Sequence, residues 1–450
     1  MPFDAIRIAR PGAAIMGYQM ADGIATDQSR RLVPLEPRSQ VTTRRGWRRL
    51  LTSPWLVAVP VLLLYGIWIF AFYGPGRDPR DAILLGRHFV TMSHASAVIK
   101  YDPTYNYPAG EIGYDGEFVY FIALDPVNAR HYVDTPSYRY SRIVLPLLAR
   151  ALALGQPALV PYVLLLINWL AIAAATLMLA MWLRRRSVSP WFALVYGFYP
   201  GLFICLQRDT TEALAYAFVV LAVFLWDYGG PRRILWSSLV FSVAVLTRES
   251  TAVFPVLYAL SLLFVAPPTD RARGPARNAW LTAALVVAMA IGPLLIYKAF
   301  LLLWLGSHGD PGLLLERVPF LGLLRQRHSG SWVEEVRSVV FPALIGAGAA
   351  AVAVWRRARL LEPWVLLANV VFFVALLPES AYVDISASAR VTAGVVLAAT
   401  LCLPVLLPVL RSRTWFWVSA TLWLSLVPFW LLRPELSWLI EVSRPLRHAL

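Results

Sequence analysis

Residues 158–186 read ALVPYVLLLINWLAIAAATLMLAMWLRRR, and this stretch decides the fold class. No charged side chain occurs from residue 158 to residue 183, and three arginines follow at once. A helix needs about 20 consecutive apolar residues to cross the hydrocarbon core of a bilayer. The stretch therefore predicts a membrane-spanning helix whose end is marked by Arg184, Arg185 and Arg186.

Similar apolar stretches recur along the chain, which is 58% hydrophobic and only 15% charged. They predict an all-α polytopic membrane protein with about 11 transmembrane helices and a single transmembrane domain over residues 54–450. Residues 1–53 are polar and are expected to form a disordered cytoplasmic tail. Segment 143–154 is too short to span and is expected to be an interfacial or re-entrant helix. The other ten predicted spans are 54–73, 190–206, 210–227, 234–247, 251–266, 279–305, 336–355, 361–377, 390–410 and 415–432.

The distribution of charge predicts the orientation of these spans. With the N-terminus in the cytoplasm, the whole net charge of +15 falls on the cytoplasmic face, in agreement with the positive-inside rule. The first long loop, 74–142, is then external. The basic patches indicate topology and contacts with bilayer lipids rather than with nucleic acid. The two cysteines, Cys205 and Cys402, both lie in apolar runs, which excludes a disulfide framework.

A carboxylate in the external loop is the first candidate for chemistry. Residues 114–125 read YDGEFVYFIALD, so Asp115 precedes an apolar, aromatic helix that can lie on the membrane surface. Asp115 is predicted to act as a general base that removes a proton from an acceptor hydroxyl, with Glu117 as the neighbouring acid. The alternative is structural, because an aspartate at this position can cap a helix.

Arginines close to the same face are the second group of candidates. In the sequence YRYSR (138–142), Arg139, Tyr140 and Arg142 form an aromatic and basic cluster that suits phosphate binding, although arginines that snorkel to an interface would have the same pattern. The external turns QRDTTE (207–212) and TRES (247–250) each place an arginine beside an acid between two apolar spans. A capping box or a local salt bridge would explain either turn alone. The substrate-binding candidates in these turns are Arg208, Asp209, Glu212, Arg248 and Glu249; weaker signals are Glu379, Asp384, Arg390, His308 and Asp310.

These motifs also resemble a family. Residues 114–126, residues 138–148 and Thr247-Arg248-Glu249 resemble bacterial integral membrane proteins of cell-surface glycopolymer formation. More distantly they are similar to glycosyltransferases of the GT-C fold that use polyprenyl-phosphate sugars, including the GPI mannosyltransferases with an Asp-Gly-type motif in the first loop. The resemblance implies a GT-C-like bundle whose periplasmic first loop carries interfacial helices, and it implies that Asp115 is the catalytic base. The second acid that is common in that superfamily has no adjacent counterpart here; Glu117 or Asp125 would have to take its place.

The resulting expectation is an inverting glycosyltransferase of the bacterial inner membrane, with its site facing the periplasm. Its partners would be a polyprenyl-phosphate-linked sugar donor and a glycan or lipid acceptor. No metal ligands are predicted, and a divalent metal is compatible with this reaction without being implied. The alternatives are a transporter or flippase of lipid-linked sugars and a non-catalytic subunit of a glycopolymer assembly complex.

Overall fold

The computed structural model describes residues 53–72, 78–93, 96–264, 276–306, 315–356 and 360–427, and these residues form helices and connecting segments without a β-strand. The predicted tail 1–53 and the candidates His308 and Asp310 lie outside the described residues, apart from residue 53 itself. The longer helices are α2 (Pro54–Phe72), α7 (Val160–Arg185), α10 (Glu212–Tyr228), α11 (Arg233–Thr247), α12 (Val253–Phe264), α13 (Ala276–Leu305), α16 (Phe341–Trp355), α17 (Leu361–Val370), α19 (Ala393–Leu410) and α20 (Thr414–Leu424).

A membrane class is supported by five described helices that are long and apolar enough to cross a bilayer, or up to seven if two bent pairs each count as one span. Each of the eleven predicted spans contains a helix, but several of these have fewer than 18 residues, among them Glu249–Phe264, Leu361–Ala375 and α20. One bent pair joins α8 (Ala193–Gly197) to α9 (Pro200–Gln207) at 50°. The larger number of full spans is therefore not established, because apolar sequence alone does not fix where a helix bends or ends.

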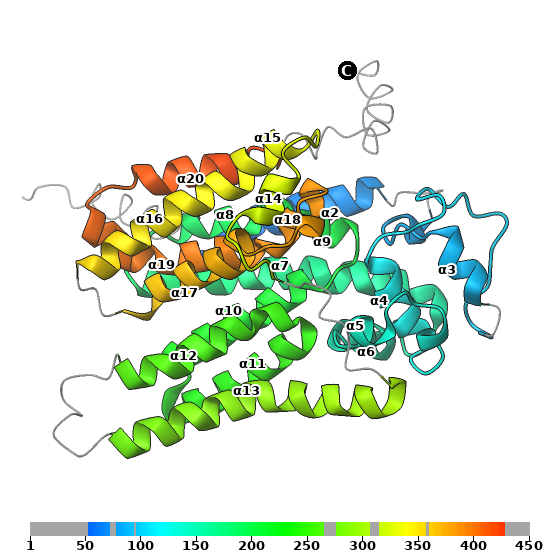
Figure 1. Cartoon of the computed structure of the whole chain (residues 1–450), viewed down its shortest axis with the longest axis horizontal. Coiled ribbons are helices and arrows are strands. Elements are labelled where there is room, and N and C mark those ends of the chain that lie inside the picture. Colours follow the sequence, from blue (N-terminus) through cyan, green and yellow to red (C-terminus); the bar gives the residue numbers. More distant parts are fainter. Residues whose placement is uncertain are drawn as a thin grey trace, which may run out of the picture. The chain divides into compact units, whose positions relative to one another are not determined.

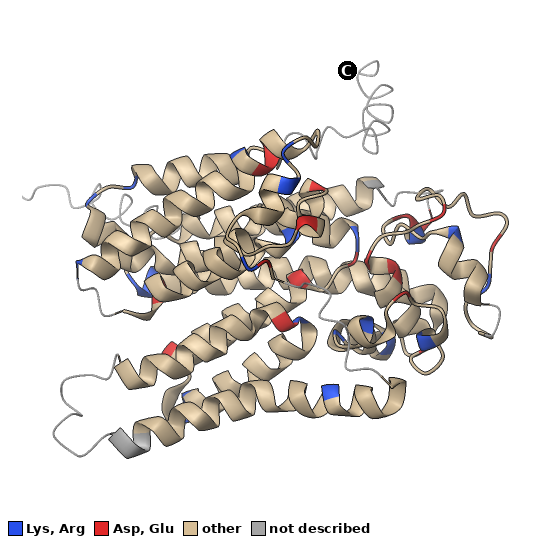
Figure 2. Ribbon diagram, in the orientation of Figure 1, with Lys and Arg blue, Asp and Glu red and all other residues tan. Residues whose placement is uncertain are grey.

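The longer helices run side by side, and the short helices α3, α4, α5 and α6 lie near one end of them (Figure 1). Pairs that pack together include α2 with α7, α10 with α11, α11 with α13, and α17 with α19. Along α7, α16 and α19 the ribbon is mostly uncharged, and charged residues concentrate at helix ends and in connections (Figure 2). The first-loop helices are α3 (Arg87–Met92), α4 (Gly116–Leu124), α5 (Pro136–Tyr140) and α6 (Val144–Leu152). Helix α6 lies where the sequence predicts a short helix at 143–154.

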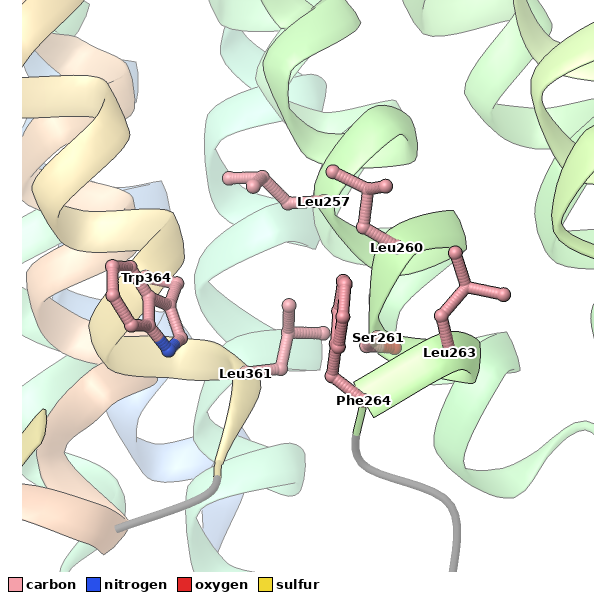
Figure 3. A pocket seen from close by; sticks show the side chains of 7 residues that line it. All are labelled: Leu257, Leu260, Ser261, Leu263, Phe264, Leu361 and Trp364. Carbon is pink, nitrogen blue, oxygen red and sulfur yellow. The ribbon is translucent and has the colours of Figure 1, made fainter. Parts of the chain in front are cut away.

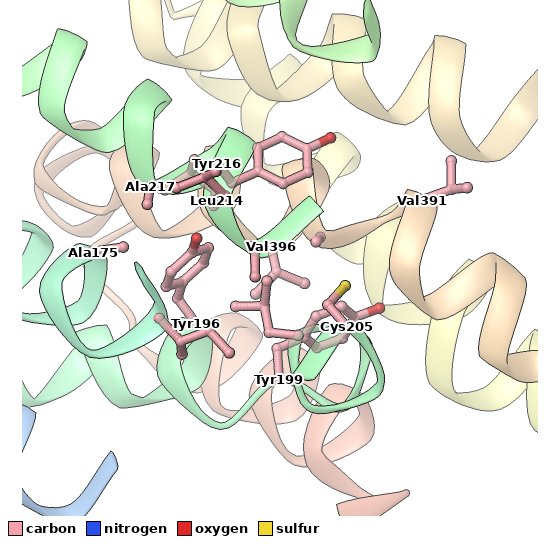
Figure 4. Packing of buried hydrophobic residues seen from close by; sticks show 14 of the residues in the cluster. Ala175, Tyr196, Tyr199, Cys205, Leu214, Tyr216, Ala217, Val391 and Val396 are labelled. Atoms are coloured by element: carbon pink, nitrogen blue, oxygen red, sulfur yellow. The ribbon is translucent and has the colours of Figure 1, made fainter. Parts of the chain in front are cut away.

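A close backbone approach and a hydroxyl contact hold the framework of the site. An added Cβ on Gly201 of α9 would lie 2.1 Å from the carbonyl oxygen of Ala389, so α9 and α18 (Ile385–Val391) can meet only at a glycine. Tyr196, Tyr199 and Tyr216 are buried between helices (Figure 4). The hydroxyl groups of Tyr199 and Thr392 lie 2.8 Å apart. The start of α19 is thereby fixed against α9, and α18 with it.

A cluster of charged residues lies away from these contacts and connects α7, α10 and α17. Arg186, which follows α7, contacts Asp227 of α10 at 2.6 Å and Glu362 of α17 at 3.7 Å. The indole of Trp182 donates to the same Asp227 carboxylate at 2.7 Å. These residues belong to the face that the charge pattern predicts to be cytoplasmic. They are separate from the candidates predicted for the other face.

Candidate functional site

Asp115 lies between two arginines that come from distant parts of the chain. Its carboxylate oxygens accept hydrogen bonds from Arg139 of α5 and Arg390 of α18, each at 2.8 Å. Asp115 does precede α4, but its side chain makes no capping hydrogen bond. The helix-cap interpretation of Asp115 is therefore wrong, because both of its carboxylate oxygens bind guanidinium groups instead.

Arg390 extends this pairing to the turn before α10. Its second terminal nitrogen lies 3.3 Å from Glu212, whose side chain has no exposed surface. Arg248, at the end of α11, lies 3.1 Å from the same Glu212 oxygen. The Arg248–Glu212 ion pair thus links the turn at 247–250 with the turn at 207–212, rather than forming within either turn. The series Arg139–Asp115–Arg390–Glu212–Arg248 alternates in charge and joins four segments of the chain.

These side chains enclose a narrow cavity whose lining is strongly positive. The charged groups lining it are one carboxylate and four arginines. The cavity measures about 20 Å³; since about 10–15 Å³ suffices for one water, it holds little more than that. Its lining residues are Asp115, Phe118, Val119, Arg139, Arg142, Thr210, Thr211, Arg248 and Arg390. A cavity with this lining suits an anion, and a larger anion requires the side chains to move apart.

The electrostatics of Asp115 follow from these neighbours. Burial favours the neutral acid, but the positive charges of Arg390 and Arg139 outweigh that effect and hold the Asp115 pKa well below its usual value. Arg139 is in turn fixed by Asp134, with two contacts of 2.7 Å, and its guanidinium lies 3.9 Å from the centre of the Phe118 ring. Asp115 is consequently an ionised carboxylate with a low affinity for protons while both arginines are in place.

Glu117 is two residues from Asp115 but faces another neighbour. Its carboxylate accepts the backbone N–H of Gly86 at 3.0 Å, and it does not line the cavity. Burial raises the pKa of Glu117 to about 8, so this carboxyl holds a proton at neutral pH. The contact joins α4 to the segment before α3. The geometry therefore separates the two predicted first-loop acids into one at the cavity and one in the packing of the loop.

Of the other predicted arginines, Arg142 lines the cavity and Arg208 does not. Arg142 lines the cavity and lies 3.6 Å from Glu249, and Glu249 also lies 3.5 Å from Lys298 of α13. The side chain of Arg208 is not among the residues that line the cavity. Its backbone nevertheless has a role, since a Cβ on Gly116 would lie 1.9 Å from the Arg208 carbonyl oxygen. The backbone of the turn at 208 therefore packs directly against the start of α4.

The remaining candidates support the surrounding structure. The hydroxyl of Tyr140 donates to the Pro126 carbonyl at 2.7 Å, and Asp209 is fully buried. Among the weaker signals, Asp384 caps α18 by accepting from the N–H of Ser386 at 3.2 Å, and Glu379 accepts from Gln326 at 3.0 Å. These contacts account for Tyr140, Asp384 and Glu379, and the buried Asp209 does not line the cavity.

Arg390 is the functional candidate that sequence reasoning placed too low. Its signal was an arginine at the start of an apolar run, 275 residues from Asp115, and only folding reveals that the two are in contact. Tyr114 strengthens the link, because its hydroxyl lies 2.9 Å from that of Ser386 and the Arg390 guanidinium lies 4.8 Å from the centre of its ring. The first loop is thus attached to α18 at two neighbouring positions.

Two other features of the described residues offer no catalytic group. No three His, Cys, Asp or Glu side chains gather there in a way that could hold a metal ion. A larger cavity of about 670 Å³ lies between α12 and α17. It is lined by Leu257, Leu260, Ser261, Leu263, Phe264, Leu361 and Trp364 and has no ionisable lining group (Figure 3). Charged groups that could perform catalysis are found at the smaller cavity.

Comparison with known proteins gives no relative. No protein-family model, curated protein or solved structure matches this chain. Function must therefore be argued from the site alone.

Proposed function

We propose that this protein is a membrane glycosyltransferase that moves a sugar from a polyprenyl-phosphate donor to a glycan or lipid acceptor. The observation that carries the proposal is the Asp115 carboxylate bound by Arg139 and Arg390 in a cavity lined by four arginines. The five to seven apolar helices that could cross a membrane are consistent with a lipid-linked donor. We place the site on the periplasmic side of a bacterial inner membrane, following the charge pattern.

The arginines supply the affinity for a phosphate. Guanidinium groups present paired N–H donors that match phosphate oxygens, and they stay charged in partly buried sites. Each of the four arginines also contacts a carboxylate, from Asp115, Asp134, Glu212 or Glu249, so a phosphate has to compete for guanidinium groups that are already paired. A lipid phosphate that enters from the bilayer would replace some of these contacts. It would also be stabilised there as a leaving group when the bond to the sugar breaks.

Asp115 is the base in this reaction, and phosphate binding controls its strength. The phosphodiester of the bound donor carries one negative charge and competes with Asp115 for Arg139 and Arg390, which weakens the effect of their positive charges on the carboxylate and raises its pKa. Asp115 then accepts the proton of the acceptor hydroxyl. The hydroxyl oxygen forms a bond to the anomeric carbon as the bond from that carbon to the phosphate oxygen breaks, with inversion of configuration. The base thus becomes effective only once the donor is bound.

The cavity must open for this reaction. A cavity of about 20 Å³ cannot hold a sugar phosphate. The lining comes from the first loop on one side and from α18 and the two turns on the other, and the contacts between them are polar. Polar contacts at the cavity can be exchanged for contacts to a charged ligand at small net cost. Separation of α4 and α5 from α18 is therefore the proposed route of opening.

A transporter of lipid-linked sugars is the competing function, and the break between α8 and α9 is the feature that favours it. No charged residue occurs from 190 to 207, around that break. Alternating-access transporters place coupling or substrate charges at such breaks. The charges here concentrate instead at helix ends, which favours an enzyme.

Lipid binding tests the proposal without knowledge of the sugar. Purified protein in nanodiscs would be titrated with a short-chain polyprenyl phosphate and with the matching polyprenol, and binding would be measured by native mass spectrometry. We expect the phosphate lipid to bind and Arg248→Gln to weaken it about tenfold or more, since charge-assisted hydrogen bonds contribute about 1.5–3 kcal/mol each. Arg325→Gln removes an arginine that pairs with Glu316 away from the cavity and serves as the control. Equal binding of the polyprenol and the phosphate lipid would refute the proposal.

A further inference from the structure

A further pocket, the first-loop pocket, lies on the other side of α4 from the arginine cavity. It measures about 360 Å³, within the range of ~300–1,000 Å³ that is typical of small-molecule sites. Its lining combines apolar side chains of Leu85, Val90, Phe121 and Leu124 with tyrosines and charged groups. A pocket with an apolar floor and a polar rim suits a ligand that has faces of both kinds.

The tyrosines form a ring platform at this pocket. Tyr101 and Tyr107 stack with ring centres 5.4 Å apart and an angle of 6° between planes, and Tyr101 is 43% exposed. Tyr107 adopts a left-handed backbone with φ of 47°, which a bulky residue rarely does. Its hydroxyl accepts the N–H of Asp102 at 3.1 Å, which helps to hold the ring in place. Backbone strain of this kind persists where surrounding contacts hold it, and it is frequent at ligand sites.

The charged rim is equally well ordered. Arg80 contacts Asp102 at 2.9 Å and is also bound by both carboxylate oxygens of Asp78. The other Asp102 oxygen accepts from the N–H and hydroxyl of Thr104. The Arg80 guanidinium lies 4.4 Å from the centre of the Tyr105 ring. Hydrogen-bonding groups are therefore held at fixed positions beside the tyrosine platform.

Helix α4 carries residues of both cavities on different faces. Asp115, Phe118 and Val119 line the arginine cavity, whereas Tyr120, Phe121 and Leu124 line the first-loop pocket. Positions three or four apart share a helix face, so each set forms one stripe of the helix. Since an α-helix with its side chains is about 10 Å wide, the two cavities are separated by about one helix.

We propose that the first-loop pocket is a subsite for a non-reacting sugar unit of the acceptor glycan. This inference rests on the proposed function and adds a location and a chemistry for the acceptor. The apolar face of a sugar ring packs on an aromatic platform, and its hydroxyl groups hydrogen-bond to the carboxylate and guanidinium groups of the rim. Because α4 separates the pocket from Asp115, the sugar held here is not the one that reacts. It is a neighbouring unit whose binding positions the reacting hydroxyl.

Saturation-transfer NMR on the full-length protein in nanodiscs tests the subsite. The probes are the methyl glycosides of glucose, mannose, galactose and arabinose, with adenosine as a planar aromatic comparison. We expect at least one glycoside to bind and Tyr101→Ala to weaken that binding about five- to tenfold, the effect of losing one aromatic contact. Tyr101→Phe keeps the ring and should bind as the wild type does. Tyr162→Ala, an exposed tyrosine on α7, is the matched control and should have no effect.

The outcomes separate this subsite from the proposed function. Glycoside binding that depends on Tyr101 supports the subsite. Absence of glycoside binding, equal binding by Tyr101→Ala, or binding of adenosine in place of glycosides would each overturn it. Polyprenyl-phosphate binding is measured on the same samples and should not change in Tyr101→Ala. Absence of glycoside binding to the wild type with intact lipid binding thus counts against the subsite alone, and failure of lipid binding in the wild type counts against the proposed function.

Discussion

Replacement of Asp115 by asparagine separates a catalytic carboxylate from a structural one. Asparagine keeps the size and one carbonyl acceptor of the side chain, but it cannot take up a proton from an acceptor hydroxyl. A general base typically contributes ~10²–10⁴-fold to rate. We therefore expect Asp115→Asn to lower sugar transfer by a factor in that range.

The cost to stability should be small for reasons that the structure supplies. Asp115 makes two ion pairs and is 35% exposed, but the Arg139 and Arg390 side chains are only 12% and 6% exposed, so each pair contributes at or above the upper end of the ~0.2–1 kcal/mol of exposed pairs. Both arginines keep another partner in the variant, since Arg139 contacts Asp134 and Arg390 contacts Glu212. No capping hydrogen bond is lost. Asp115→Asn should consequently insert and fold with a loss of about 1–2 kcal/mol at most.

The assay is transfer of labelled sugar from the lipid-linked donors of host membranes to membrane acceptors, with purified protein in proteoliposomes. Asp134→Asn is the matched control, because it removes the other carboxylate partner of Arg139 and leaves Asp115 in place. We expect it to keep most of the activity. If Asp115→Asn transfers sugar near the wild-type rate while Glu117→Gln abolishes transfer, the wrong carboxylate has been chosen. If both variants stay active, the first loop is structural and the enzyme proposal loses its main support.

Three further predictions concern the surroundings of the site. Arg390→Lys should lower the apparent melting temperature in detergent by an amount that corresponds to about 1–3 kcal/mol. The reason is that one ammonium group cannot contact both Asp115 and Glu212 as two guanidinium nitrogens do. An unchanged melting temperature would contradict the bridging role. Glu117 has a folded pKa of about 8 against an ordinary 4.5, so the folded state binds more protons between these values and stability should fall by a few kcal/mol as pH rises from about 5 to 8. Glu117→Gln should flatten this pH dependence in thermal unfolding and still accept the Gly86 N–H; a wild-type stability independent of pH would refute the argument. Reporter fusions after residues 110 and 187 should give opposite compartments, and the same compartment for both would overturn the proposed topology.

The candidate site shows which of its features local sequence motifs can predict and which they cannot. The sequence motifs at 138–142, 207–212 and 247–250 identify most of the arginines and acids that the structure brings together. They do not identify partners: Arg248 pairs with Glu212 in another turn, and Arg390 reaches Asp115 across 275 positions. Sequence reasoning also grouped Glu117 with Asp115 as a neighbouring catalytic acid. The backbone N–H of Gly86 on one side and the arginines on the other make them chemically different.

The sequence by itself determined the membrane class and the positions of the apolar helices, because a run of about 20 consecutive apolar residues is a local property of the chain. It also predicted that the few charged residues near helix ends carry the functional information. Only the tertiary structure decided which helices reach the full length, which acid meets the arginines, and that α4 separates two cavities. Ion pairs and cavities depend on the packing of distant segments such as α5, α11 and α18, and no local pattern of residues encodes that packing.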